Sequence, residues 1–137
     1  MTFISGLNRT SINIQRASDA RIRTIALAAY QEISNGSPVD TGTFRANWVA
    51  SVDGIDRSAD MSKTKRDVQE ARSKATAVIT NGAKLGTTVY ISNSVPYAGL
   101  LENGYSQQTT PSGRNAAEGV VAPAVTVIKN KIENKKL

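Results

Sequence analysis

The chain has 137 residues, of which 39% are hydrophobic and only 5% aromatic, and its formal net charge is +6. This length suits a single domain whose modest core is built mainly from alanine, valine, isoleucine and leucine. It contains no cysteine and no histidine, which excludes disulfides and zinc sites of the Cys/His type and suits a reducing cytoplasm.

A long amphipathic helix is the first predicted element, over residues 12–33. Its apolar positions recur at steps of three and four residues, at Ile22, Ile25, Ala26, Ala29 and Ile33. The helix is expected to stop at Asn35 and Gly36, because glycine readily takes the left-handed conformation just past a helix end.

A turn and a strand follow. Pro38 fixes its own φ, the side chains of Asp40 and Thr41 can bond nearby backbone amides, and Gly42 permits a positive φ. After this turn the apolar residues alternate with their neighbours, which predicts a strand over residues 48–52.

The middle of the chain predicts a loop, a second helix and a second strand. Residues 53–66 are polar and charged without an apolar period, so we expect an exposed loop. Helical spacing then returns at Val68, Ala71, Ala75, Val78 and Ile79. Residues 87–92 are β-branched and aromatic, which favours a strand that pairs antiparallel with the first.

The last third predicts two more helices. Asn93 or Ser94 is expected to cap a short helix that places Tyr97, Leu100 and Leu101 on one face. Residues 105–119 have the composition of an exposed loop. Helical spacing resumes at Val121, Val125, Ile128 and Ile132, although the β-branched content leaves a strand open for residues 120–128. The expected fold is one α+β domain over residues 1–137, with a long N-terminal helix and further helices on a small, mainly antiparallel sheet.

The sequence offers little catalytic chemistry. Asp40, Thr41 and Gly42 spell a tripeptide found in aspartic proteases, but here they follow a helix exit and a proline, so a structural turn is favoured. Glu102 with Asp40 or Asp56 could form an acid–base pair, yet no spacing supports one. Phosphate-binding glycine motifs are absent. We therefore expect no enzyme, with no catalytic, cofactor-binding or metal-binding residue.

The positive charge favours an anionic partner, either nucleic acid or an acidic protein surface. The densest basic cluster comprises Lys63, Lys65 and Arg66, with Arg72 and Lys74 further along. Acidic residues interleave with it, so a solvated face is favoured over a nucleic-acid interface. No stretch is long and apolar enough to span a membrane, and the first residues do not resemble a secretory signal.

Two motifs carry a family resemblance. The first motif (residues 37–48) includes Pro38, Asp40, Thr41, Gly42, Arg45 and Trp48, and the second motif (residues 93–106) includes Pro96, Tyr97, Leu101, Glu102 and Gly104. Together and in this order they resemble the tail-completion proteins of tailed bacteriophages, also described as neck, head–tail joining or prophage minor tail proteins. The likeness covers most of the chain. It departs at Tyr105, where such proteins often have tryptophan, and at the longer turn of residues 109–114.

The resemblance implies an α+β protomer in a hexameric ring at the head–tail junction of the virion, assembled in the host cytoplasm. Its implied partners are the connector or adaptor and the tail terminator or tube, with genome DNA in the lumen and no catalysis. The loops 53–66 and 105–119 are candidate contacts, and the residues expected at an interface or facing DNA are Lys63, Lys65, Arg66, Arg72, Lys74, Tyr105 and Arg114. The alternatives are a tail terminator or other minor tail component and, in another class, a small basic DNA-binding protein.

Overall fold

The computed structural model describes residues 2–104, 106, 108 and 110–137, with side chains from Asp19 onward, so Tyr105 lies outside the described residues. The helices and strands are α1 (Thr2–Asn35), α2 (Thr43–Ala46), β1 (Val49–Val52), α3 (Val68–Gly82), β2 (Val89–Ser92), α4 (Ala98–Glu102) and α5 (Val121–Glu133). Two short 3₁₀ turns, η1 (Lys65–Asp67) and η2 (Ala116–Glu118), precede α3 and α5. The predicted α+β class is confirmed.

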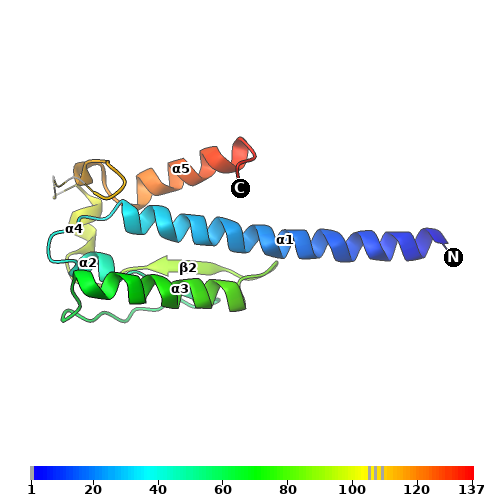
Figure 1. The fold of residues 1–137 in the computed structure, drawn as a ribbon, viewed down its shortest axis with the longest axis horizontal. Helices are drawn as coiled ribbons and strands as arrows, with labels where there is room; N and C mark the ends of the chain where they lie inside the picture. Colours follow the sequence, from blue (N-terminus) through cyan, green and yellow to red (C-terminus); the bar gives the residue numbers. More distant parts are fainter. Residues whose placement is uncertain (1, 105, 107, 109) are drawn as a thin grey trace.

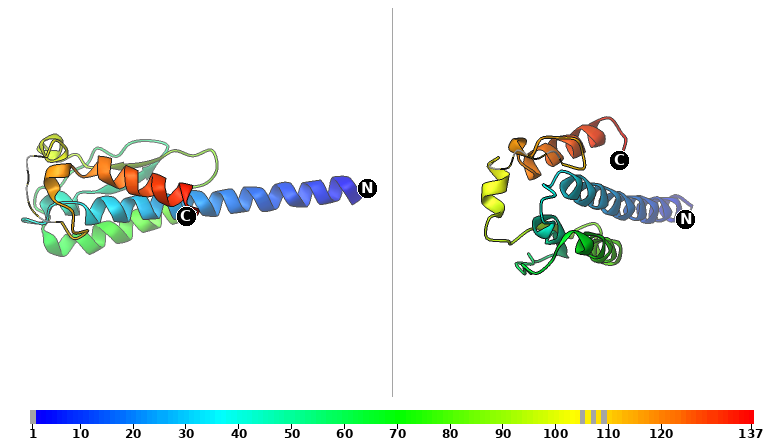
Figure 2. Two further views of the ribbon diagram at one scale, coloured as in Figure 1. Left: turned by 90° about the horizontal axis from the view of Figure 1, so that it is seen from above. Right: turned by 60° about the vertical axis from the view of Figure 1, so that its left-hand side comes forward.

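Helix α1 lies between the other elements. It packs against α5 on one side and against α3 on the other, with the sheet beside α3 and with α2 and α4 at one end (Figures 1 and 2). No helix in the described part of the chain is long and apolar enough to cross a membrane.

The sheet consists of β1 and β2, paired antiparallel as the sequence predicted. Val49 lies opposite Ser92, and Val52 lies opposite Val89. Because side chains alternate along a strand, Ala50 and its partner Ile91 share one face. Ala50 is buried, and α3 packs closely against β1.

The core combines a few aromatic rings with many small side chains. Tyr30, Phe44 and Trp48 are buried together with residues from α1, α3, α5 and β1 and with Val120 just before α5. These residues are Ala26, Ile33, Ala50, Ala75, Ile79, Val120 and Ala124. The alanines allow the helices to approach closely. The buried aromatic rings of the described residues, Tyr30, Phe44 and Trp48, lie where α1, α2 and the start of β1 meet.

For α4 and α5, the prediction of which residues form the buried face is partly wrong. Helix α5 is helical from Val121, which rules out the strand alternative, and it buries Ala124 and Ile128 while Val125 is 43% exposed. In α4, Leu100 is 52% exposed, so it does not share the buried face with Leu101. Alanine is only weakly hydrophobic, so in α5 the larger apolar residues led the prediction to place the buried face next to the one that is actually buried.

Two local predictions also need correction. Asn93 does not cap α4, because its Oδ1 accepts a hydrogen bond from the Val95 amide, and Tyr97 occupies the cap position without a side-chain bond. Helix α2 was not predicted, since four residues are too few to show a period. The predicted stop of α1 at Asn35 is confirmed, and α3 ends at Gly82.

Candidate functional site

The first motif joins the end of α1 to β1 through buried hydrogen bonds. Trp48 Nε1 donates to Ser37 Oγ over 2.8 Å, and Ser37 Oγ donates to the Ile33 carbonyl over 2.7 Å. Tyr30 donates its phenolic hydrogen to the Trp48 carbonyl over 3.0 Å. Phe44 packs edge-to-face against Trp48, with 5.4 Å between ring centroids. The motif therefore fixes the exit of α1 against the start of the sheet.

The same motif also anchors the end of the predicted loop. Gly42 has φ of 85°, and a Cβ there would collide with the backbone of Lys65. The Lys65 amide donates to the Thr41 carbonyl over 3.1 Å, and Thr43 Oγ1 donates to the Lys63 carbonyl over 2.7 Å. This position therefore favours glycine for two reasons: its φ is positive, as predicted, and the backbone of Lys65 lies too close for a side chain.

The loop 53–66 is exposed over most of its length, yet it is locally ordered. Asn47 bonds the backbone of Asp60 in both directions, accepting from its amide over 2.7 Å and donating to its carbonyl over 3.0 Å. Asp56 accepts hydrogen bonds from the hydroxyl and amide of Ser58, and Asp60 accepts the same pair from Ser62. These hydrogen bonds lower the pKa of both carboxyls.

The second motif caps the last helix with a carboxylate. Glu102 Oε1 accepts from the amides of Val120 and Val121 over 3.1 and 2.8 Å, and its Oε2 accepts from the Ala122 amide over 3.1 Å. A negative charge at the N-terminus of α5 also interacts favourably with the helix macrodipole. Glu102 is therefore engaged in fixing α5, which gives it a structural role in place of the acid–base role considered from the sequence.

Two glycines allow the end of the second motif to pack closely against the segment that precedes α5. Gly104 has φ of 84°, and a Cβ there would collide with the Ala117 carbonyl. Gly119 has φ of 88° and lies against the Glu102 carbonyl. Pro96 is exposed just before α4. The motif thus folds the chain tightly between α4 and α5.

The two motifs meet at a pocket of about 340 Å³, which we call the motif pocket. Asn93 Nδ2 donates to the Phe44 carbonyl over 2.7 Å, and the rings of Phe44 and Tyr97 lie 6.5 Å apart. Burial, with a smaller effect of the Asp40 carboxylate, raises the pKa of Tyr97. The residues lining the pocket are Pro38, Asp40, Thr41, Gly42, Phe44, Tyr97, Leu101, Ser106 and Gln108.

The motif pocket is the candidate functional site. Its lining joins the apolar surfaces of Phe44 and Leu101 to the exposed carboxylate of Asp40. Such a surface can receive a side chain with an apolar stem and a cationic end, because the stem is buried while the charge meets the carboxylate. Among the described residues no cluster of acidic side chains is suited to hold a metal ion.

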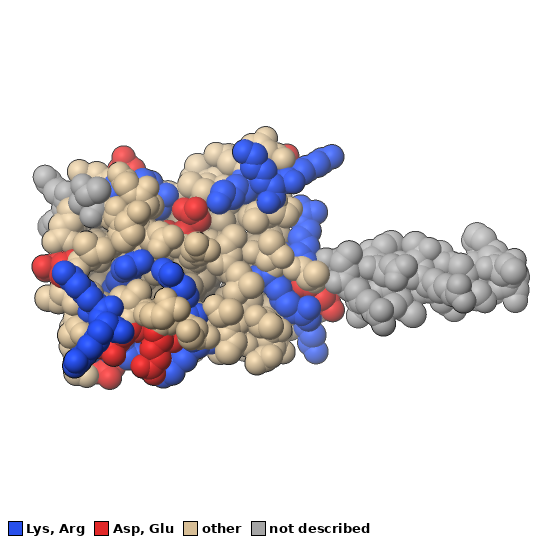
Figure 3. Space-filling view, viewed as in Figure 1, with Lys and Arg blue, Asp and Glu red and all other residues tan. Residues whose placement is uncertain are grey.

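The basic residues expected on one face are divided among several places. Lys74 forms an exposed ion pair with Glu70 over 3.1 Å, and Arg72 Nη2 donates to Asn35 Oδ1. Lys63 and Lys74 border a groove between β1 and α3, while Lys65 and Arg66 lie in η1. Figure 3 shows basic side chains separated by acidic and neutral surface on the face in view.

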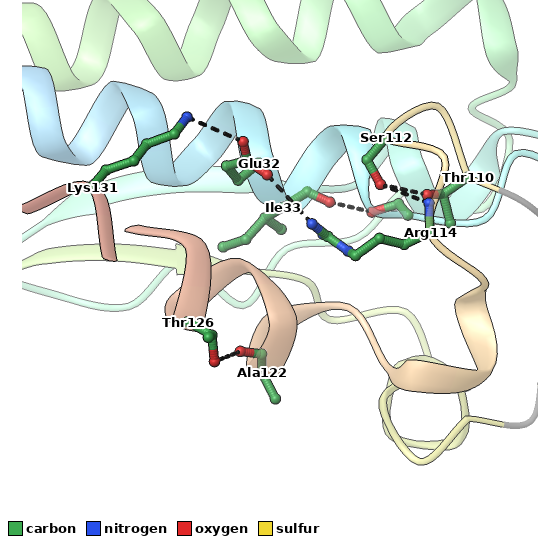
Figure 4. A network of polar contacts seen from close by, with 9 residues as sticks. Glu32, Ile33, Thr110, Ser112, Arg114, Ala122, Thr126 and Lys131 are labelled. Carbon is green, nitrogen blue, oxygen red and sulfur yellow. Dashed lines mark hydrogen bonds and ion pairs between the residues drawn. The ribbon is translucent and has the colours of Figure 1, made fainter. Parts of the chain in front are cut away.

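Arg114 turns toward α1. Its Nη1 lies 3.5 Å from one oxygen of Glu32, and Lys131 Nζ lies 3.5 Å from the other (Figure 4). The guanidinium fills the space that a Cβ at Gly36 would need, and φ of Gly36 is not positive. Gly36 therefore provides room for Arg114 and does not take the predicted left-handed conformation.

Most described residues of the predicted loop 105–119 are exposed, but a few are buried. Thr110 and Ala116 are buried, and the Ser112 amide donates to the Asn35 carbonyl over 2.7 Å. This stretch lies beside the end of α1, so its contacts depend on Asn35, which is far away in the sequence. The sequence could not show that dependence.

Asn35 is a polar centre that sequence reasoning missed. Its Oδ1 accepts from Arg45 Nη2 over 3.2 Å and from Arg72 Nη2 over 3.3 Å. Arg45 Nε also donates to the Ser34 carbonyl over 2.9 Å. The sequence showed Asn35 only as a helix stop, and no spacing rule links it to arginines 10 and 37 residues away.

Comparison of the chain with protein-family models, with curated proteins and with solved structures gave no match.

Proposed function

We propose that this chain is a structural virion protein of the head–tail junction of a tailed bacteriophage, of the tail-completion or neck type. The proposal is supported by the resemblance of the two motifs. One observation strengthens it: the motifs are separated by more than forty residues in sequence, yet both line the motif pocket. Motifs that converge on one site are consistent with a shared role in recognition.

In this proposal the chain assembles as a hexameric ring between the connector and the tail, without catalysis or a cofactor. The motif pocket receives a basic side chain from a neighbouring subunit or from the connector, tail terminator or tube. Asp40 supplies the negative charge, and Phe44 and Leu101 contact the apolar stem. The ring then joins the tail to the connector while genome DNA passes through its lumen.

Native mass spectrometry and a pull-down with purified tails and connectors test this proposal. We expect an oligomer of several copies, or capture by one of these partners. Asp40→Asn should weaken whichever contact is observed, whereas Asp53→Asn, at an exposed carboxylate outside the pocket, should not. A chain that stays monomeric at high concentration and binds neither structure would contradict the proposal.

Two alternatives give different results. A tail terminator or other minor tail component would occupy a different ring position, which cryo-microscopy of the particle distinguishes. A small DNA-binding protein would bind duplex DNA with an affinity that falls steeply as salt rises.

A further inference from the structure

Arg45 and Arg72 direct their guanidinium groups to a single neutral acceptor. Both Nη2 atoms lie within hydrogen-bond distance of Asn35 Oδ1, although the two residues come from α2 and α3. Both side chains are partly buried. Arg72 Nε is buried and has no hydrogen-bond partner among the described residues. The fold therefore brings two positive charges together at the end of α1.

No acidic side chain in the described part of the chain forms an ion pair with either arginine. Burial, followed by the repulsion of Arg72, lowers the pKa of Arg45. The nearby Tyr30 keeps its proton at neutral pH, since burial raises its pKa to about 12. Two like charges in a partly desolvated place are unfavourable unless an anion joins them.

We propose that Arg45 and Arg72 form a binding site for a phosphate group. Two guanidinium groups match the charge of a phosphate dianion, and their N–H forks match its oxygens. Arg72, though not Arg45, lines a surface groove whose other residues are uncharged, namely Gln69, Ser73, Thr76, Ala77, Thr80 and Asn81. This surrounding suits one phosphate group better than a long stretch of nucleic-acid backbone.

This inference does not depend on the proposed function. The phosphate group can be free or can belong to a nucleic acid, and the two sources share one chemistry at the arginines. Inorganic phosphate and a short duplex DNA are the probes that separate them.

Titration of the full chain, labelled with ¹⁵N-arginine, tests the site. Inorganic phosphate is added at constant ionic strength, with chloride as the reference anion, and the Nε–Hε signals are followed. We expect the signals of Arg45 and Arg72 to shift and saturate together, while that of Arg66, exposed in η1, stays unchanged. A merely structural role for the arginines would not produce this response.

Substitutions make the test specific. Arg72→Gln should weaken the phosphate response of Arg45 about ten- to a hundredfold, because a charged hydrogen-bond partner is lost. Arg72→Lys keeps the charge but loses the fork, so an intermediate effect is expected. Lys74→Gln removes the same charge from an exposed position on α3 and should leave the response unchanged. Circular dichroism checks that each variant is folded.

The outcomes are distinct. Duplex binding that is lost in Arg72→Gln and kept in Lys74→Gln assigns the site to nucleic acid, and a response to inorganic phosphate alone assigns it to a free phosphate. Arginine signals that respond to neither probe overturn the inference. A response that is equal in wild type and Arg72→Gln overturns it as well.

Discussion

The two motifs join neighbouring elements by different means. The first motif works inside the core, where Trp48 is only 4% exposed and its indole bonds the fully buried Ser37. The second motif contributes Val95 to the core, but most of it lies at the edge, where α4 has no buried residue and Glu102 caps α5 through three backbone amides. Damage to the first motif should therefore weaken the whole fold, whereas damage to the second should mainly release α5.

The largest effect is expected at Trp48. Trp48→Ala should lower the free energy of unfolding by about 3–5 kcal/mol, because it removes a buried ring and leaves Ser37 with one hydrogen bond fewer. Urea denaturation measures the change. Tyr90→Ala, at a partly exposed aromatic residue of β2, is the control and should cost about 1 kcal/mol or less. Equal losses would contradict the assignment of Trp48 to the core.

Tyr30 should make the first motif sensitive to alkali. Burial raises its pKa from 10.0 to about 12, so the unfolded chain releases the phenolic proton at a lower pH than the folded chain. This contribution is complete below pH 10 and is lost as pH rises to about 12, amounting to roughly 2–3 kcal/mol.

Denaturation at several alkaline pH values checks the prediction. Tyr30→Phe lacks the hydrogen bond to the Trp48 carbonyl and should be less stable than wild type at pH 7. Its stability should nevertheless fall less steeply between pH 10 and pH 12. Identical slopes would show that other groups cause the alkaline loss.

The glycine turns provide a comparison between the motifs. Gly42 and Gly104 both have positive φ and both lie against backbone, whereas Gly86 has positive φ with open space around it. Gly42→Ala and Gly104→Ala should each cost about 2 kcal/mol or more, and Gly86→Ala about 1 kcal/mol. Thermal unfolding of the three variants measures the losses of stability. Three equal losses would mean that the close backbone contacts add nothing to the destabilisation caused by placing alanine at a positive φ.

The smallest effect is expected at the cap of α5. Glu102→Gln should cost about 1–2 kcal/mol, because the amide keeps one acceptor but loses the charge at the helix N-terminus. Hydrogen exchange should accelerate at the amides of Val121 and Ala122 more than in α3. Glu118→Gln, at an exposed carboxylate nearby, is the control, and an equal change in both variants would contradict the capping role.

The sequence predicted what depends on local pattern. Residues that recur at helical spacing located α3, alternation located β1, and β-branched and aromatic composition located its antiparallel partner β2. It was less successful where alanine forms the buried face, as in α5, because the exposed Val125 carries the stronger hydrophobic signal. It missed α2 because four residues show no period.

The polar contacts of the site were largely beyond sequence reasoning. Glu102 reaches amides 18 to 20 residues away, and Arg72 reaches Asn35 across 37 residues. No local rule links such partners, since they meet only after the elements have packed. The family resemblance was enough to select the motif residues, but only the folded structure shows that they line one pocket.

The packing of α5 against α1 has a consequence for biosynthesis. Lys131 meets Glu32 across 99 residues of chain, and Val120 and Ala124 belong to the same core as Ala26 and Tyr30. Helix α1 leaves the ribosome before α5, so the side that receives α5 stays uncovered until α5 has been translated. The nascent chain therefore carries an exposed apolar surface on α1 until α5 emerges, and a chaperone has its best opportunity to bind in that interval.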